Sequence, residues 1–171
     1  MLRWFFRRKL NAEEKRLGAS MDYLRHVVDV SPTAFLRFAA IMPFADSRKT
    51  LPADAWFVAQ LVALQQEDCG PCVQIGVNLA KDSGVASNVV QAVLDSDREK
   101  LSADLVTVFD FTKSVLATED DDSLRQSLRE RYGERGLVEL AYAIAGSRIP
   151  PTVKRVLGYA TSCSTVRVDV A

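Results

Sequence analysis

The sequence predicts an all-α fold, a single-domain bundle of about eight short helices, for three reasons. Apolar residues recur at helical spacing along most of the chain. No two segments of alternating apolar and polar residues flank a hairpin turn such as Asn-Gly. The 171 residues, 48% of them hydrophobic, suffice for one core and are few for two domains. We expect the helical domain at residues 21–164, after a basic and aromatic N-terminal arm (1–20) and before a tail (165–171).

Proline and serine delimit the first two expected helices. An apolar stripe over residues 22–30 ends at Ser31, which precedes Pro32. Ser31 suits the N-cap of the next helix, and Pro32 suits its first helical position. Pro43 should close this second helix, because proline has no backbone N–H to donate inside a helix. We expect a polar surface loop after it.

A third helix, buried on most of its surface, should run over residues 52–66, directly before two closely spaced cysteines. Apolar residues from Cys72 onward again have helical spacing, and Gly84 suits the position just past the end of that helix. The thiols of Cys69 and Cys72 should therefore lie at a helix start.

Five further helices are expected in the second half of the chain. They cover residues 88–94, 102–115, 124–132, 137–148 and 152–159, and Ser102 is the N-cap of the second. Gly133 should end the third of them, and Pro150-Pro151 should separate the last two. The tail alternates valines but is short and terminal, so we expect it to be mobile or loosely docked.

Charge and hydropathy exclude several classes of function. Lys+Arg and Asp+Glu both number 22, so the chain lacks the excess of basic residues typical of a nucleic-acid-binding protein. No segment approaches the roughly 18 consecutive apolar residues of a membrane span, and the apolar run of the arm is too short for a secretory signal. We expect a cytoplasmic protein whose N-terminal arm makes no stable membrane contact, since two turns of arginine and aromatic residues are too few for anchoring.

The chain has three cysteines, and this odd number does not resemble the disulfide framework of a secreted module. Structural zinc needs four ligands, and the chain offers only Cys69, Cys72, Cys163 and His26 for them. We therefore expect no metal and no cofactor. Cys163 is interpreted as a passive thiol, and His26 as an ordinary surface or core histidine.

The Cys69-Gly70-Pro71-Cys72 tetrapeptide is the main candidate for chemistry. A helix start favours the thiolate, which is the nucleophilic form, while Gly70 and Pro71 favour a rigid turn. One cysteine would attack a peroxide or a disulfide and the other would resolve the product, after which a protein or small thiol would restore the dithiol. The alternative is a pair of inert buried cysteines, and the order of attack stays open.

Neighbouring polar residues complete the candidate site. Glu67 is a candidate proton acceptor for a thiol, although a solvated helix end is the alternative interpretation, and Asp68 suits the N-cap. Gln74 is a candidate for binding substrate, as glutamine can hydrogen-bond sulfur or a bound molecule, and Gln60, Gln65 and Gln66 share this property. The candidate catalytic residues are therefore Cys69, Cys72, Glu67 and Asp68.

Thioredoxins share the tetrapeptide, but there it follows a buried strand, whereas the residues before Cys69 are helical in pattern. The segment Glu67 to Ala80, placed after a buried helix and before Gly84-Val85, instead resembles the core of the alkylhydroperoxidase D-like branch of the carboxymuconolactone decarboxylase-like superfamily. Residues 138–155 resemble its closing helices, and residues 22–39 its leading pair. The resemblance implies an all-helical trimer or hexamer that reduces peroxides through its cysteine pair.

Two positions depart from that family. Its redox members commonly have a histidine four residues after the second cysteine and a glutamate twelve before the first, where this chain has Gly76 and Phe57. Either Glu67, Asp68 or a glutamine substitutes, or the pair is a slower disulfide reductase, or the fold is a non-catalytic oligomeric scaffold or interaction protein. The sequence favours a thiol-dependent peroxidase or disulfide reductase.

Overall fold

The protein consists of helices and their connections over the residues that the computed structural model describes, 2–45, 47–160, 166 and 168. The helices are α1 (Leu2–Leu17), α2 (Asp22–Val30), α3 (Pro32–Ala45), α4 (Ala53–Gln66), α5 (Gly70–Asp82), α6 (Ser87–Leu94), the 3₁₀ turn η1 (Arg98–Lys100), α7 (Ala103–Leu116) and α8 (Asp122–Val156). The described part of the chain contains no strand, so the predicted all-α class is confirmed.

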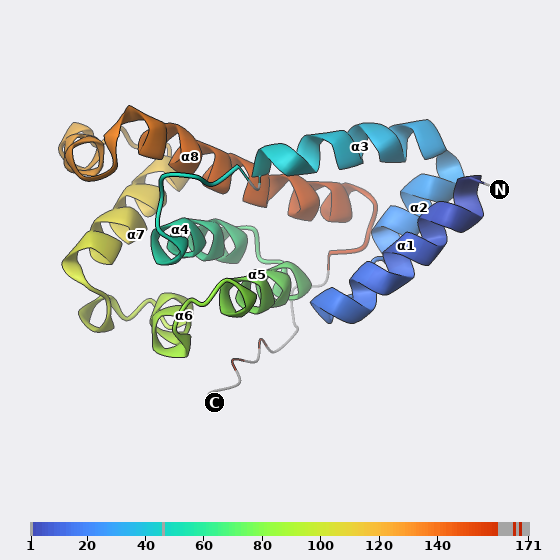
Figure 1. The fold of residues 1–171 in the computed structure, drawn as a ribbon, viewed down its shortest axis with the longest axis horizontal. Coiled ribbons are helices and arrows are strands. Elements are labelled where there is room, and N and C mark those ends of the chain that lie inside the picture. The colour runs from blue at the N-terminus through green and yellow to red at the C-terminus, as the bar shows by residue number, and fades with distance from the viewer. Residues whose placement is uncertain (1, 46, 161–165, 167, 169–171) are drawn as a thin grey trace.

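Helix α4 is the centre of the bundle (Figure 1). All residues from Ala55 to Leu64 are buried, as expected of a helix that is apolar on all sides. Helices α5, α6, α7 and α8 all pack on it and form one continuous core with it. This arrangement fixes the end of α4, and hence the turn that carries the cysteines, inside the bundle.

A second, smaller core joins α1, α2 and α3 at one end of the molecule (Figure 1). Phe6 and Leu10 of α1 pack there with Tyr23 and Val28 of α2. The segment that we expected as an N-terminal arm is therefore a helix packed on the bundle, and it leaves Trp4 exposed. No helix in the described residues has the length and apolar character needed to cross a membrane.

Several predicted boundaries are confirmed. Helix α2 ends before Ser31, and the Ser31 hydroxyl accepts a hydrogen bond from the Ala34 backbone N–H at 3.2 Å, as an N-cap should. Gly84 follows the end of α5 with φ of +81°, and the Val85 N–H donates to the Ala80 carbonyl across this turn, at 3.0 Å. Start and stop signals in the sequence thus placed these ends correctly.

The predictions at three prolines are wrong. Helix α3 continues past Pro43 to Ala45, and α8 runs through Pro150 and Pro151 without a break. Proline inside a helix removes one backbone hydrogen bond, and its ring presses on the carbonyl of the residue four positions earlier. Pro151 is fully buried, so packing holds the helix together although two backbone donors are missing.

Helix α8 changes direction once and ends earlier than expected. Gly133 has φ of +70° and ψ of 176°, which separates the residues 122–132 from the rest of α8, as the sequence predicted. The helix stops at Val156 instead of Tyr159, because Gly158 takes the left-handed conformation with φ of +77°. The Tyr159 N–H then donates to the Lys154 carbonyl at 2.8 Å, which closes the last turn.

A buried carboxylate ties α8 to the connection between α3 and α4. Glu139 accepts hydrogen bonds of 2.8–3.0 Å from the backbone N–H groups of Lys49, Thr50 and Leu51. Burial alone would raise the pKa of Glu139, but these donors favour the ionised form and bring it below its ordinary value. Of the predicted tail, Val166 and Val168 are described and pack on the main core, while Cys163 lies outside the described residues.

Candidate functional site

The two cysteines of the tetrapeptide form a disulfide at the start of α5. Cys69 is the N-cap, and its carbonyl accepts hydrogen bonds from the N–H groups of Cys72 and Val73 at 2.8 and 3.0 Å. The Cα atoms of the pair are 5.3 Å apart, a separation typical of disulfides. The prediction that both sulfurs lie at a helix start is confirmed.

Asp68 does not cap α5, so that part of the prediction is wrong. It has φ of +45° and is exposed, and its N–H donates to the Gln65 carbonyl at 3.0 Å. It thus occupies the left-handed position just past the end of α4, a conformation that aspartate tolerates better than most residues. The sharp turn there leaves Cys69 as the N-cap of α5.

Glu67 is buried at 8% exposure and lies between two arginines of α8. Arg148 Nε donates to Glu67 Oε1 at 2.7 Å, and Arg155 Nη1 donates to Oε2 at 3.2 Å. Burial opposes ionisation of this carboxyl, but the two guanidinium groups outweigh it and lower the pKa of Glu67. The carboxylate is therefore held ionised, as the partner of two cations.

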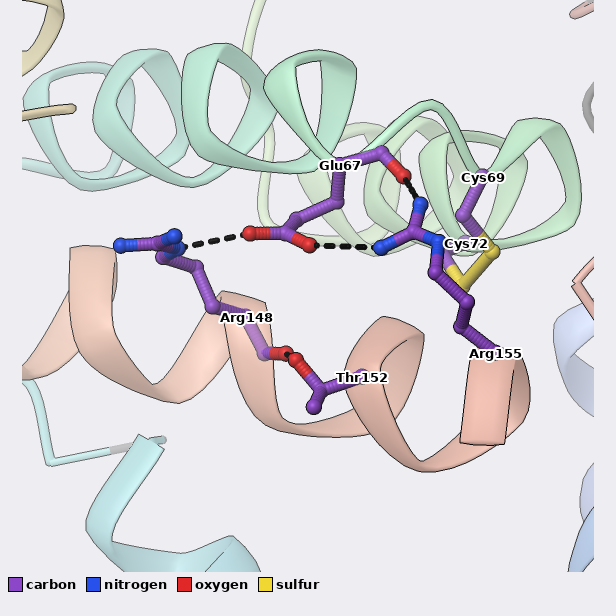
Figure 2. Close-up of a disulfide and its surroundings, with 6 residues drawn as sticks. All are labelled: Glu67, Cys69, Cys72, Arg148, Thr152 and Arg155. Atoms are coloured by element: carbon purple, nitrogen blue, oxygen red, sulfur yellow. Dashed lines mark hydrogen bonds and ion pairs between the residues drawn. A yellow bond between two sulfur atoms is a disulfide. The ribbon is translucent and has the colours of Figure 1, made fainter. Parts of the chain in front are cut away.

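Arg155 also binds the backbone of the cysteine turn. Its Nη2 donates to the Glu67 carbonyl oxygen, two residues before Cys69. Figure 2 shows this side chain reaching from α8 into the surroundings of the disulfide, with its guanidinium toward Glu67. A guanidinium near a reduced cysteine pair favours a thiolate, as does the start of α5. Burial opposes it, because Cys69 is 0% and Cys72 4% exposed.

The structure explains the glycine at the position where the resembled family has histidine. A Cβ on Gly76 would lie 2.7 Å from Leu64 Cδ1 and 3.1 Å from Leu61 Cδ2. Helices α4 and α5 thus approach too closely there for any side chain without rearrangement. Phe57, at the other departing position, is buried in the main core. A histidine at position 76 would require Leu64 and Leu61 to move, and a glutamate at position 57 would place a carboxylate in the main core.

The remaining candidates lie in several places. The Gln74 amide donates to Asn78 Oδ1 at 2.9 Å, and the Asn78 amide donates to the Leu17 carbonyl at 2.9 Å, which links α5 to the end of α1. Gln65 binds the Leu94 carbonyl, Gln66 is exposed, and Gln60 is buried. His26 is exposed on α2, and its Nδ1 lies 3.2 Å from the Tyr159 hydroxyl.

Cys72 lines a cavity of about 390 Å³ between the small core and the central helices. Its walls are mainly apolar and come from α1, α2, α3, α4, α5 and α8. Its polar and charged lining residues include Tyr23, Gln60, Ser147 and Lys154, and Glu13 and Arg16 lie near the surface. A cavity of this volume can hold a small organic molecule, and such a molecule would lie against the wall that Cys72 helps to form.

Lys154 and the two arginines were not predicted from the sequence. Ser147 and Lys154, like Arg148 and Arg155, are seven residues apart, which places each pair on one face of a continuous helix. One pair lines the cavity and the other binds Glu67. The predicted break at Pro150 hid this spacing, which was the available signal.

The described residues contain no group of three or more histidine, cysteine or acidic side chains arranged to hold a metal ion. The chemical groups that the structure gathers are thus a disulfide, a buried ion pair and an apolar cavity with one lysine. Comparison of the chain with protein-family models, with curated proteins and with solved structures finds no match.

Proposed function

We propose that the protein is a thiol redox protein in which Cys69 and Cys72 alternate between a dithiol and a disulfide. The single observation that carries this proposal is the disulfide at the start of α5, with Cys72 in the wall of an apolar cavity. Two observations support it: the cysteine pair is in bonding range, and Cys72 lines a cavity that a second reactant could enter.

The cycle transfers two electrons. A thiolate attacks the peroxide oxygen, which gives a sulfenic acid and an alcohol, and the second thiol then condenses with the sulfenic acid to release water and form the disulfide. With a disulfide substrate the thiolate forms a mixed disulfide, which the second thiol resolves with release of the substrate thiol. A protein or small thiol supplies the two electrons that restore the dithiol.

Cys72 is the better candidate for the attacking sulfur, because it lines the cavity while Cys69 has no exposed surface. Arg155 is the candidate for stabilising a thiolate, in a chain that lacks the histidine and glutamate with which the resembled family deprotonates a thiol. The all-helical bundle is compatible with the alkylhydroperoxidase D-like fold, and we include that resemblance, a homo-oligomeric state and a cytoplasmic, reducing location in the proposal.

A redox titration of the full chain tests the proposal. The protein is equilibrated in buffers of oxidised and reduced dithiothreitol, the free thiols are alkylated, and the mass of each species is measured. We expect one reversible two-electron transition that Cys69→Ser and Cys72→Ser each abolish, while Cys163→Ser leaves it unchanged. A pair that stays unreactive until the protein unfolds would refute the proposal.

The alternative function is a non-catalytic scaffold of the same fold. The observation that favours it is that Gly76 and Phe57, both packed inside the bundle, stand where the resembled family has the histidine and the glutamate. The two functions differ in one rate. A redox pair reacts rapidly with a thiol reagent in the folded, reduced protein, whereas packed thiols react only at the rate of unfolding.

A further inference from the structure

We propose that the cavity beside Cys72 binds a small molecule with an apolar body and a carboxylate, and that the Lys154 ammonium holds the carboxylate. This site is distinct from the redox pair in its chemistry. Binding needs the lysine and the apolar walls, and it does not require either sulfur to react.

Lys154 is a buried cation that lacks an anion. It is 3% exposed, and its ammonium forms no ion pair with any acidic side chain in the described part of the chain. Its Nζ lies 5.0 Å from the centroid of the Tyr23 ring, which is a cation–π contact and supplies no negative charge. A buried charge is costly unless it is paired, so the site is incomplete as it stands.

Electrostatics at the cavity favour a negative ligand. The other charged residues that line it are Glu13 and Arg16, which bind each other at 2.8 Å near the surface. Their charges cancel, and Lys154 remains as the net positive charge of the cavity. Burial lowers the pKa of Lys154, and an anion beside it would raise that pKa and stabilise the charged form. The buried cation thus gains most from a carboxylate.

The size and walls of the cavity define the rest of the ligand. A volume of about 390 Å³ corresponds to about thirteen waters at about 30 Å³ each, enough for an organic molecule of roughly ten non-hydrogen atoms. Leu10, Leu24 and Phe38 from three different helices provide apolar surface. A single lysine suits a monoanion, whereas a phosphate ester would need more donors. A short fatty acid has the required chemistry.

Octanoate, which has this size, is the probe, measured by titration calorimetry on the full chain. We expect saturation at one site with a dissociation constant of about 0.1–1 mM, as for ligands of few atoms. The neutral 1-octanol should bind at least about tenfold more weakly, because it cannot pair with the ammonium. Equal affinities for the acid and the alcohol, or no saturable binding of octanoate, would overturn the proposal without any variant.

Two variants test the lysine itself. Lys154→Met keeps a chain of similar length and removes a buried charge, so it should fold, and octanoate affinity should fall at least about tenfold while 1-octanol affinity holds. The matched control is Lys113→Met, since Lys113 makes the same 5.0 Å contact with the Phe109 ring on an exposed surface. This control should bind octanoate as the unmodified protein does, and unchanged affinity in Lys154→Met would refute the role of the lysine.

Octanoate binding is also measured in the Cys69→Ser variant, which cannot form the disulfide and keeps Cys72 in the cavity wall. We expect the affinity to stay within about threefold, because the carboxylate partner is Lys154 and not a sulfur. Retained binding together with an inert cysteine pair would refute the redox function alone. Loss of binding with a working redox pair would refute the carboxylate site alone.

Discussion

Replacing Glu67 by glutamine separates two roles for this carboxylate. If Glu67 accepts a proton from a thiol, Glu67→Gln should slow thiol reactions by about 10²–10⁴. If its role is to bind Arg148 and Arg155, the variant should lose stability instead, and Arg155, freed of its anion, should favour the thiolate at least as strongly as before. The geometry of the two arginines predicts the second result.

The expected loss of stability follows from the hydrogen bonds that Arg148 and Arg155 donate to the Glu67 carboxylate. A bond to a charged group contributes about 1.5–3 kcal/mol, but both arginines are 51% exposed and one contact is 3.2 Å long, so we expect a total loss of about 2 kcal/mol. For a chain of 171 residues this lowers the melting temperature by about 4–8 °C. Thermal unfolding followed by circular dichroism measures it.

The stabilisation that Glu67 contributes should decrease as the pH falls. The pKa of Glu67 is lowered in the folded protein, so the stabilisation is complete above the unfolded value of about 4.3 and is lost as the pH falls through the folded value. The difference between the protein and Glu67→Gln should therefore be full at pH 7 and shrink in acid below about pH 4. An equal difference in stability at pH 7 and below about pH 4, or slower thiol reactions of Glu67→Gln at pH 7, would refute the reasoning.

Glu139→Gln is the matched control for this experiment, because it makes the same change at a second buried carboxylate with three backbone donors. It should destabilise the fold by about 2 kcal/mol, through loss of at least one charge-assisted bond, and leave alkylation of the cysteines unchanged. A change in thiol reactivity here would show that such effects arise from general destabilisation.

Three further substitutions have expected outcomes. Gly76→His introduces the residue that the resembled family has, and its Cβ would lie 2.7 Å from Leu64 Cδ1. It should lower the free energy of unfolding in urea by at least about 1–3 kcal/mol, and an unchanged midpoint would contradict the close packing of α4 and α5. Gly133→Ala should lower the free energy of unfolding by about 1–2 kcal/mol in the same assay, because alanine disfavours a positive φ. An unchanged free energy would contradict the backbone conformation at Gly133. Arg155→Leu should slow alkylation of the reduced pair at pH 7 by roughly three- to tenfold, and an equal or faster rate would remove Arg155 from the redox proposal.

Local sequence signals determined most helix ends correctly. Ser31 before Pro32, and Gly84 and Gly133 after helical segments, act through backbone geometry that depends on a few neighbours, so they could be predicted. The continuous helix at Pro150 could not, because it depends on tertiary packing around the buried Pro151.

The candidate site could be predicted only in part, for the same reason. The cysteine turn is encoded within four residues, and its place at a helix start followed from the sequence. The partners of Glu67 lie 81 and 88 residues away, and Lys154 meets Tyr23 across the bundle. Such pairs depend on how the helices pack, which periodicity along one segment does not reveal.

The hydrogen bonds made by α8 have a consequence for folding during synthesis on the ribosome. Glu139, Arg148 and Arg155 together satisfy backbone and side-chain groups of residues 49–67, all synthesised much earlier. Until α8 emerges, one flank of α4 stays open to water and the turn before Cys69 lacks its anchors. A nascent chain should therefore reach the native cysteine geometry only late in translation, when its thiols have already met the redox conditions of the cell.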